Sequence, residues 1–460
     1  MGIAGDAHHL GNVLQQVVGQ TATPCNLKAK HNKWKKGSFK IMNIEPSSET
    51  KQTSGFIQTF KSLSDPNFRT LWLGMFFTVA SMQINVVTRS WIAYDLSGSA
   101  LMLGVVAIAR GLPQIILSPI GGVIADRFDK RKVLMIAQSI LLVLALFNAI
   151  LVHTNLIQIW HLVVIGIFQG AVFPFTMPTR QALIPLLVGK DNLPNALAMD
   201  SAGRNLNRVL APSMAGVLIT WCPTIAFYTV AAFYLISILT MTKLPSVKAT
   251  VDSTQNPMQQ MLYGFSYIIE NRRLLIFIGM GFLAVTLGMP YQQMLAFFQD
   301  DVLHAGPEVL GFMYTAVGVG ALFGSLFVVY RSGDPRRQGY QLIAGVCFGA
   351  LLIPFALSGN LVFSLTCLVL IGFSNEVFMT VNHMMVILNT DEHLYGRVMG
   401  TYGMTLSLMP IATLPMGYFV DKIGGSTIAG AGFLLAVTVL ILSSIRIQGA
   451  NSGGVLKYVP

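Results

Sequence analysis

The sequence predicts an all-α membrane protein with twelve transmembrane helices in two pseudo-symmetric six-helix bundles. Of its 460 residues, 53% are hydrophobic and 11% are charged, and the mean hydropathy of +0.62 is far above that of an ordinary soluble domain. Apolar runs of roughly twenty residues recur along the chain, which is the length that a membrane helix needs. These runs are continuous rather than alternating, and this pattern favours helices over a β-barrel.

The distribution of positive charge predicts the orientation in the membrane. Although the net charge is +11, Lys and Arg gather in every second loop between apolar runs, as topology rather than nucleic-acid binding would require. The loops between these basic loops have almost no Lys or Arg. Both termini are therefore predicted to be cytoplasmic, in a multi-pass protein of the cytoplasmic membrane.

The apolar runs define the predicted helices in order, and Gly, Pro, Asn and Asp mark most of the turns between them. The predicted spans are Arg69–Tyr94, Ala100–Ala125, Val133–Val152, Ile159–Thr179, Ala196–Trp221, Ile225–Lys243, Leu274–Phe298, Val309–Tyr330, Gly339–Leu357, Leu361–Leu388, Val398–Val420 and Ser426–Ile447.

The loss of hydrophobicity after the sixth span predicts a division into two halves. Residues 1–60 are expected to be a disordered cytoplasmic tail, with Met42 as an alternative start of the chain. The bounds of the predicted domains are taken from the predicted spans. The linker between the two bundles is expected to contain an amphipathic segment at Met258–Asn271. The predicted domains are the bundle 61–243, the cytoplasmic linker 244–273, the bundle 274–447 and a short tail 448–460.

The charged turn after the second span is the most informative motif. It reads G-G-V-I-A-D-R-F-D-K-R-K from Gly121, and a looser copy with Arg and Asp follows the eighth span. It resembles the loop signature of the major facilitator superfamily, although Asp129 stands where that pattern has glycine. The resemblance implies a gating motif in which Asp126 docks at the start of helix eleven near Arg397. The gating residues are then Gly122, Asp126, Arg127, Lys130, Arg131, Arg180 and Arg397.

Four further blocks resemble the branch of that superfamily that contains the enterobactin exporter and related efflux proteins. They are W-I-A-Y-D-L-S-G-S from Trp91, P-T-R-Q-A-L-I-P from Pro178, N-L-P-N-A-L-A from Asn192, and G-R-V-M from Gly396. A weakened exporter-like motif follows on helix five, with Arg204, Pro212 and Gly216. The resemblance implies a monomer in which helices 1, 4, 7 and 10 line a central cavity.

Polar residues within the apolar spans fall on these same four helices. Glu376, Thr380 and His383 share one face of helix ten, where a carboxylate and an imidazole could carry protons. Arg89 is predicted either to reach the outer interface or to attract an anionic group of a substrate, and Arg110 to pair across the bundle. The predicted cavity residues are Asn85, Arg89, Gln169, Phe173, Gln292, Gln293, Glu376, Thr380 and His383, with Glu376 and His383 as the proton-coupling pair.

Together these features predict a proton-coupled exporter of a small amphipathic compound such as a siderophore, a macrolide or another drug-like molecule. Its expected partners are the substrate, protons and anionic lipids at the cytoplasmic surface, without nucleic acid. No cofactor, metal or enzymatic activity is expected, because the four cysteines lack metal spacing and the chain lacks a nucleotide-binding loop. An importer of the same fold, or a non-transporting receptor on this scaffold, are the alternatives.

Overall fold

The computed structural model describes residues 61–245, 266–331, 334, 336–391 and 394–452. In these ranges the chain is helical, and no strand occurs. Eleven described helical stretches are long and apolar enough to cross a membrane. The one predicted span that is not among these eleven, Ala196–Trp221, lies in the second part of a 63-residue helix that is interrupted at Gly189. The predicted all-α membrane fold is confirmed, whereas most of the predicted tail and linker lies outside the described residues.

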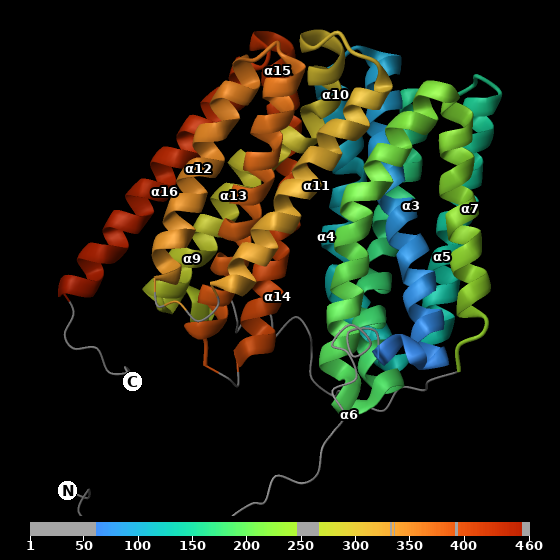
Figure 1. The fold of residues 1–460 in the computed structure, drawn as a ribbon, viewed down its shortest axis with the longest axis horizontal. Helices are drawn as coiled ribbons and strands as arrows, with labels where there is room; N and C mark the ends of the chain where they lie inside the picture. Colours follow the sequence, from blue (N-terminus) through green and yellow to red (C-terminus); the bar gives the residue numbers. More distant parts are fainter. Residues whose placement is uncertain (1–60, 246–265, 332–333, 335, 392–393, 453–460) are drawn as a thin grey trace, which may run out of the picture. The chain divides into compact units, whose positions relative to one another are not determined.

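The first half consists of α3 to α7, which Figure 1 shows together on one side. Asp65 begins the first helix by accepting hydrogen bonds from the N–H groups of Asn67 and Phe68, and Gly98 ends it in a left-handed conformation with φ of 57°. The helices of this half are α3 (Pro66–Ser97), α4 (Ala100–Arg127), α5 (Lys130–His153), α6 (Ile159–Trp221) and α7 (Pro223–Met241).

The fourth and fifth predicted spans form one element, α6, with a break between them. Gly189 has φ of 69° and ψ of 174°, which is not helical, and glycine tolerates this conformation because it has no Cβ. The break lies between the two predicted spans, Ile159–Thr179 and Ala196–Trp221. Below, the part of α6 before Gly189 is called α6a and the part after it α6b.

The second half is less regular. Helix seven is interrupted around Gly288 and Pro290, and helix eleven is interrupted at Ser407 and Leu408. The helices of this half are α9 (Arg272–Leu283), α10 (Leu295–Phe297), α11 (Pro307–Tyr330), α12 (Arg337–Leu357), α13 (Leu361–Leu388), α14 (Tyr395–Leu406), α15 (Met409–Ile423) and α16 (Ser426–Ser452). Between α9 and α10 lie a π-helical turn, Ala284–Gly288, and a 3₁₀ turn, Met289–Met294.

The two halves meet along two helix pairs, α4 with α15 and α6 with α11. Small residues allow the backbones to approach closely in both pairs, as is usual between membrane helices. A Cβ atom on Gly104 would lie 2.8 Å from Cα of Leu414, and one on Gly216 would lie 2.9 Å from Cα of Gly311. The halves therefore fit backbone to backbone, and a side chain at either glycine would push them apart.

Candidate functional site

We call the two ends of the helices inner and outer, after the orientation predicted from Lys and Arg. Most of the predicted cavity residues lie inside the helical bundle. Asn85, Arg89 and Gln169 are buried, and Glu376 and Thr380 are half-buried. The remaining predicted cavity residues are the half-buried Phe173, Gln292 and Gln293 and the exposed His383.

An ion pair between the two halves is the central feature of the site. The Arg208 guanidinium on α6b donates to the Glu376 carboxylate on α13 with an N–O distance of 2.9 Å. The Thr380 hydroxyl, one turn along α13, lies 3.5 Å from the other carboxylate oxygen. Both charged side chains are partly exposed, at 35% and 24%, so the pair is accessible to water rather than sealed. The sequence singled out Glu376 but not its partner Arg208.

His383 lies apart from this ion pair. It is seven residues beyond Glu376, which corresponds to about 10 Å along a helix. Its ring faces Tyr402 of α14 with a centroid distance of 5.6 Å. The neighbouring Asn382 bonds Gln341 of α12 and the Tyr402 hydroxyl, at 2.7 and 3.1 Å, so this stripe of α13 joins helices within the second half. His383 therefore occupies a different environment from Glu376.

The outer ends of the two halves are held together by several polar contacts. Asp421 at the end of α15 accepts hydrogen bonds at the start of α4, from Ser99 Oγ at 2.5 Å and from the N–H groups of Ala100 and Leu101 at 2.6 and 3.1 Å. Two further contacts join the halves at their outer ends, Tyr94 Oη to Asp301 at 2.8 Å and Thr220 Oγ1 to Glu308 at 2.8 Å. The carboxylate of Asp421 thus caps a helix that belongs to the other half.

The predicted gating motif is described only in part. The side chains of Asp126, Arg127 and Arg397, and the surroundings of Gly122, lie outside what the structure describes. Asp129, which departs from the family pattern, begins α5 by accepting from the N–H groups of Arg131 and Lys132. The sequence therefore replaces a glycine turn here with a helix cap.

The basic residues of this motif do not behave alike. Lys130 is buried at 5% exposure, so it does not face the lipid surface where we predicted it. The guanidinium of Arg131 donates to the carbonyl oxygen of Thr242 at the end of α7, at 2.5 Å. The Arg131 side chain therefore links the start of α5 to the end of α7.

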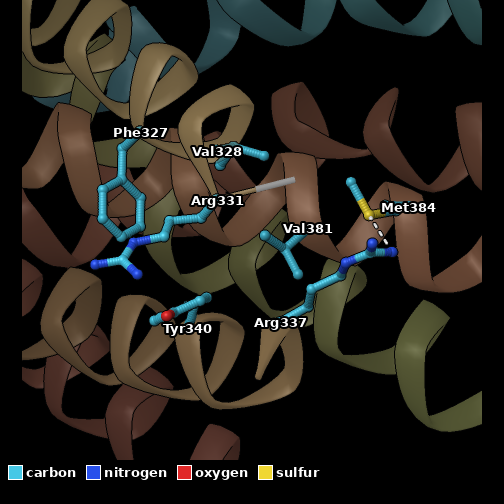
Figure 2. A pocket seen from close by; sticks show the side chains of 7 residues that line it. All are labelled: Phe327, Val328, Arg331, Arg337, Tyr340, Val381 and Met384. Atoms are coloured by element: carbon cyan, nitrogen blue, oxygen red, sulfur yellow. Dashed lines mark hydrogen bonds between the residues drawn. The ribbon is translucent and has the colours of Figure 1, made fainter. Parts of the chain in front are cut away.

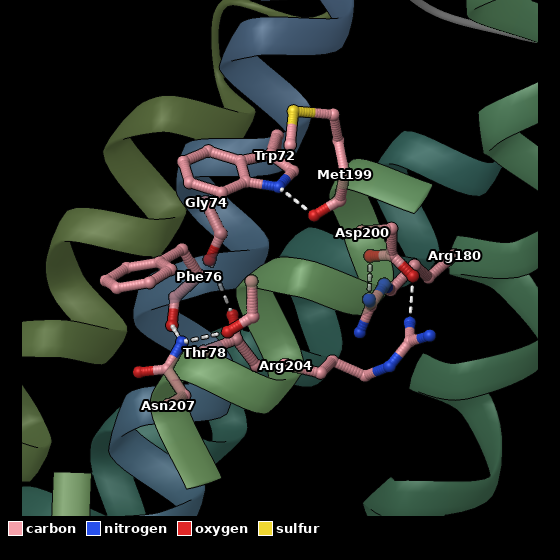
Figure 3. Close-up of polar contacts among 10 residues, drawn as sticks. Trp72, Gly74, Phe76, Thr78, Arg180, Met199, Asp200, Arg204 and Asn207 are labelled. Atoms are coloured by element: carbon pink, nitrogen blue, oxygen red, sulfur yellow. Dashed lines mark hydrogen bonds and ion pairs between the residues drawn. The ribbon is translucent and has the colours of Figure 1, made fainter. Parts of the chain in front are cut away.

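Arg180 forms part of a charge cluster on α6 that Figure 3 shows. The Asp200 carboxylate accepts from Arg180 of α6a through one oxygen and from Arg204 of α6b through the other. Arg180 and Asp200 are largely buried, with 5% and 9% of their side chains exposed, whereas Arg204 is 37% exposed. The cluster ties together the two parts of α6 across the Gly189 break.

A polar stripe on α6b continues outward from this cluster. Asn207 donates to the backbone carbonyl of Phe76 on α3 at 3.1 Å, and the indole N–H of Trp72 donates to the carbonyl of Met199 at 2.9 Å (Figure 3). One turn further outward, Pro212 and Gly216 face α11, where Gly311 fits between them. Of the exporter-like motif, Pro212 and Gly216 therefore lie against the second half, whereas Arg204 bonds Asp200 of its own helix.

A pocket at the inner ends of α11, α12 and α13 was not anticipated from the sequence (Figure 2). Two guanidinium groups reach it, and Arg337 contacts Met384 Sδ at 3.7 Å. Arg331 lies over the Tyr340 ring and pairs with Asp334 at 3.6 Å. The lining residues are Phe327, Val328, Arg331, Arg337, Tyr340, Val381 and Met384.

Comparison with known families gives a match across nearly the whole helical region. The family model for transmembrane secretion effectors, a family of the major facilitator superfamily, matches residues 57–454. The chain belongs to this family. It is a multi-pass membrane transporter rather than an enzyme.

This family member is similar to curated exporters along most of its length. The enterobactin exporters EntS of Shigella boydii serotype 18 and of Escherichia coli are each 24% identical to it over 405 residues, which is 83% of this chain and 93% of theirs. These relatives support the superfamily that the loop motif suggested and the branch that the four further sequence blocks suggested.

Solved structures show the same fold at lower identity. The nucleoside transporter NupG aligns with a TM-score of 0.67 at 15% identity, covering 84% of this chain and 99% of that one. A bacterial homologue of the human lysosomal transporter Spinster, in an inward-facing and unoccupied conformation, aligns with a TM-score of 0.63 at 11% identity, covering 83% and 95%. Both support the transporter fold and say nothing of this chain's substrate.

Sequence reasoning missed three contacts that the structure shows between or within the halves. Arg208 is the partner of Glu376, Asp200 is the partner of Arg180, and Asp421 caps α4. A signal for Asp421 was present, because Gly417-Tyr-Phe-Val-Asp421-Lys422 has the same G-x-x-x-D-basic spacing as Gly122 to Arg127. No comparable pattern pointed to the pairing of Arg208 with Glu376, because it joins residues far apart in the chain.

Proposed function

We propose that this protein is a proton-coupled exporter of the cytoplasmic membrane that moves a small amphipathic compound by alternating access. The observation that carries the proposal is the Arg208–Glu376 ion pair between the two halves. Support for the export direction comes from the relatives, which are exporters by name. The transporter is expected to act as a monomer with both termini cytoplasmic, in contact with anionic lipids on that side.

The ion pair offers a direct means of coupling protons to movement. Glu376 is negative when deprotonated and then attracts Arg208 across the interface between α13 and α6b. A proton on Glu376 removes that attraction. The free energy needed to separate the two halves at the α6b–α13 contact is then lower. Because the carboxylate is partly exposed, protons can reach it through water. Thr380 can hold the carboxyl group in place in either state.

The outer contacts indicate which state of the cycle the structure represents. In alternating access the halves separate on one side while they stay in contact on the other. Here the contacts of Asp421, Asp301 and Glu308 close the outer side. An opposite state would break these contacts and bring Asp126 to the start of α14, as the loop motif predicts. The two carboxylates, Asp421 and Asp126, would then act as alternative outer and inner locks.

The test is transport by the purified protein in liposomes under an imposed pH gradient, with a panel of siderophores, macrolides and dyes. The wild type should move a compound in exchange for protons, and Glu376→Gln should lose the dependence on the gradient. Gradient-driven flux is expected to fall by about tenfold or more. A factor of this size corresponds to a typical coupling free energy between two sites. Glu270→Gln, which changes an exposed carboxylate outside the site, is the matched control and should transport normally.

Each alternative function predicts a different result in this assay. Flux that ignores the gradient, or that persists in Glu376→Gln, would remove Glu376 from coupling. Compound and protons moving in the same direction would make the protein an importer or symporter. Absence of flux for the entire panel, together with a requirement for residues 1–60 in cells, would favour the receptor alternative.

A further inference from the structure

Two arginines in the first half lie near the middle of the membrane. Arg89 is eight residues from the outer end of α3, and Arg110 is ten residues from the outer start of α4. At 1.5 Å per residue these positions lie about 12 and 15 Å below the outer end, close to the middle of a hydrocarbon core about 30 Å thick. A charge at this depth is at its most costly unless something neutralises it.

The side chain of Arg89 is directed into the bundle rather than toward the outer surface. It is 5% exposed, and a Cβ atom on Gly166 of α6a would lie 3.6 Å from Arg89 Nη1 and 3.6 Å from the backbone N of Arg110. The guanidinium therefore lies beside Gly166, among α3, α4 and α6a. The alternative prediction, in which Arg89 reaches the outer interface, does not match this position.

Neither arginine has an acidic partner among the described residues. The ion pairs of the described ranges involve Arg180, Arg204, Arg208 and Arg331. The expected pairing of Arg110 across the bundle is therefore not observed. Arg89 lies near Arg110 and near Tyr314 of α11, and Arg110 lies near Tyr234 of α7. A phenol supplies no counter-charge at neutral pH.

Two buried hydrogen-bond donors at this place lack acceptors. Arg89 Nη1 and Asn85 Nδ2 have no hydrogen-bond partner, although both residues are at least 95% buried. Asn85 and Arg89 are four residues apart on α3, so their side chains lie on the same face. Leaving such donors unsatisfied costs on the order of 1–3 kcal/mol each, and more for the charged one. The site thus combines excess positive charge with unsatisfied donors, which is what an anionic oxygen group would satisfy.

We infer that Arg89, Arg110 and Asn85 form the binding site for the anionic group of the transported compound, which is therefore an organic anion such as a carboxylate. This inference rests on the proposed transport function and specifies its substrate class. The planar guanidinium of Arg89 is suited to a carboxylate, because its N–H groups match the two oxygens. Tyr314 belongs to the second half, so an anion bound here contacts the boundary between the halves.

The test measures binding of a probe at equilibrium, without a pH gradient. A failure to bind can therefore be distinguished from a failure of proton-coupled transport, which is measured separately as flux. The probes are salicylate and salicylamide, which have nearly the same shape and differ in charge, with sodium chloride as a third arm. The purified full-length protein should bind salicylate at least tenfold more tightly than salicylamide in equilibrium titrations, and salicylate should raise its Tm by several degrees. Equal binding of the two probes would overturn the inference, as would an effect reproduced by chloride alone, which would indicate an inorganic anion.

Substitutions separate a binding role from a structural one. Arg89→Gln and Arg110→Gln should each weaken salicylate binding at least tenfold while leaving the Tm of the probe-free protein equal or higher, because an unpaired charge near the middle of the membrane has been removed. Arg89→Lys should retain part of the affinity. Arg336→Gln, an exposed arginine on the predicted inner surface, is the control and should bind as the wild type does.

A second variant keeps the inference testable if these proteins prove hard to purify. Asn85→Asp places a carboxylate one turn from Arg89, so the protein supplies its own anion. It should keep or gain thermal stability and lose most salicylate binding. Retention of full salicylate affinity in Asn85→Asp, or a lower probe-free Tm in Arg89→Gln, would show that the two arginines have a structural role instead.

Discussion

Two clusters of arginine in the first half differ in how their charge is compensated. In the α6 cluster, Arg180 and Arg204 share the Asp200 carboxylate, so each has a counter-charge within the protein (Figure 3). In the α3–α4 cluster, Arg89 and Arg110 have no carboxylate partner among the described residues. The contrast teaches that burial alone does not identify a binding site. An arginine with an internal counter-charge stabilises the fold, whereas one without it needs a partner from outside.

The largest expected effect comes from removing the counter-charge of the first cluster. Asp200→Asn leaves Arg180 buried without compensation, so we expect a loss of roughly 3 kcal/mol in the free energy of unfolding. Thermal unfolding in detergent would measure it as a marked decrease in Tm. Asp191→Asn, a carboxylate of the same helix nine residues earlier, serves as a comparison. If Asp200→Asn were as stable as the wild type, the distinction between the two clusters would fail.

A smaller effect is expected where a carboxylate interacts with a helix end rather than with a cation. Asp421→Ala removes three hydrogen bonds from the start of α4 and should weaken the outer contact by about 1 kcal/mol, the usual value of a helix cap. Spin labels at the exposed Leu156 and Val362, on the outer ends of the two halves, should then show a larger fraction of long distances. Lys422→Ala, which loses only a contact with Tyr418, should not change that distribution.

The partly exposed ion pair at the site should contribute less still to stability. A double-mutant cycle with Arg208→Gln and Glu376→Gln should give a coupling energy of about 0.5–1 kcal/mol, because water screens both groups. The same two substitutions should have large effects on transport. A coupling energy as large as that of a buried ion pair would instead indicate that Arg208 and Glu376 have a structural role, like the α6 cluster.

The smallest effect is expected at the surface pair near the pocket of Figure 2. A hydrogen bond from the Tyr340 hydroxyl at 2.6 Å, together with the N–H of Arg336, holds the pKa of Asp334 below its usual value. Because the folded-state pKa is lowered, the stabilisation is present above the unfolded pKa of about 3.9 and is lost as the pH falls through the lower, folded value. Asp334→Asn should therefore lower Tm slightly at pH 7 and leave it unchanged near pH 2. If the difference in Tm between Asp334→Asn and the wild type grew larger at acid pH, the sign of the pH dependence would be reversed and this account would be contradicted.

Much of the architecture followed from the sequence alone. The length and continuity of the apolar runs determined the all-α membrane fold, since an unpaired backbone cannot cross a bilayer. Glycine and proline marked the interruption of helix seven, and the charged loop after helix two pointed to the superfamily that the family match later confirmed. The polar face of α13 was also visible, because Glu376 and Thr380 are one turn apart.

Only the tertiary structure decided which charges are compensated. Sequence spacing shows partners within one helix, such as Asp200 and Arg204, but not partners brought together by packing, such as Arg208 with Glu376 or Asp421 with the start of α4. It likewise predicted a partner for Arg110 where the described residues provide no acid. Electrostatic energy depends on distance and burial in three dimensions. The sequence therefore determined which charges enter the membrane, and the packing of the helices decided which of them remain without a counter-charge.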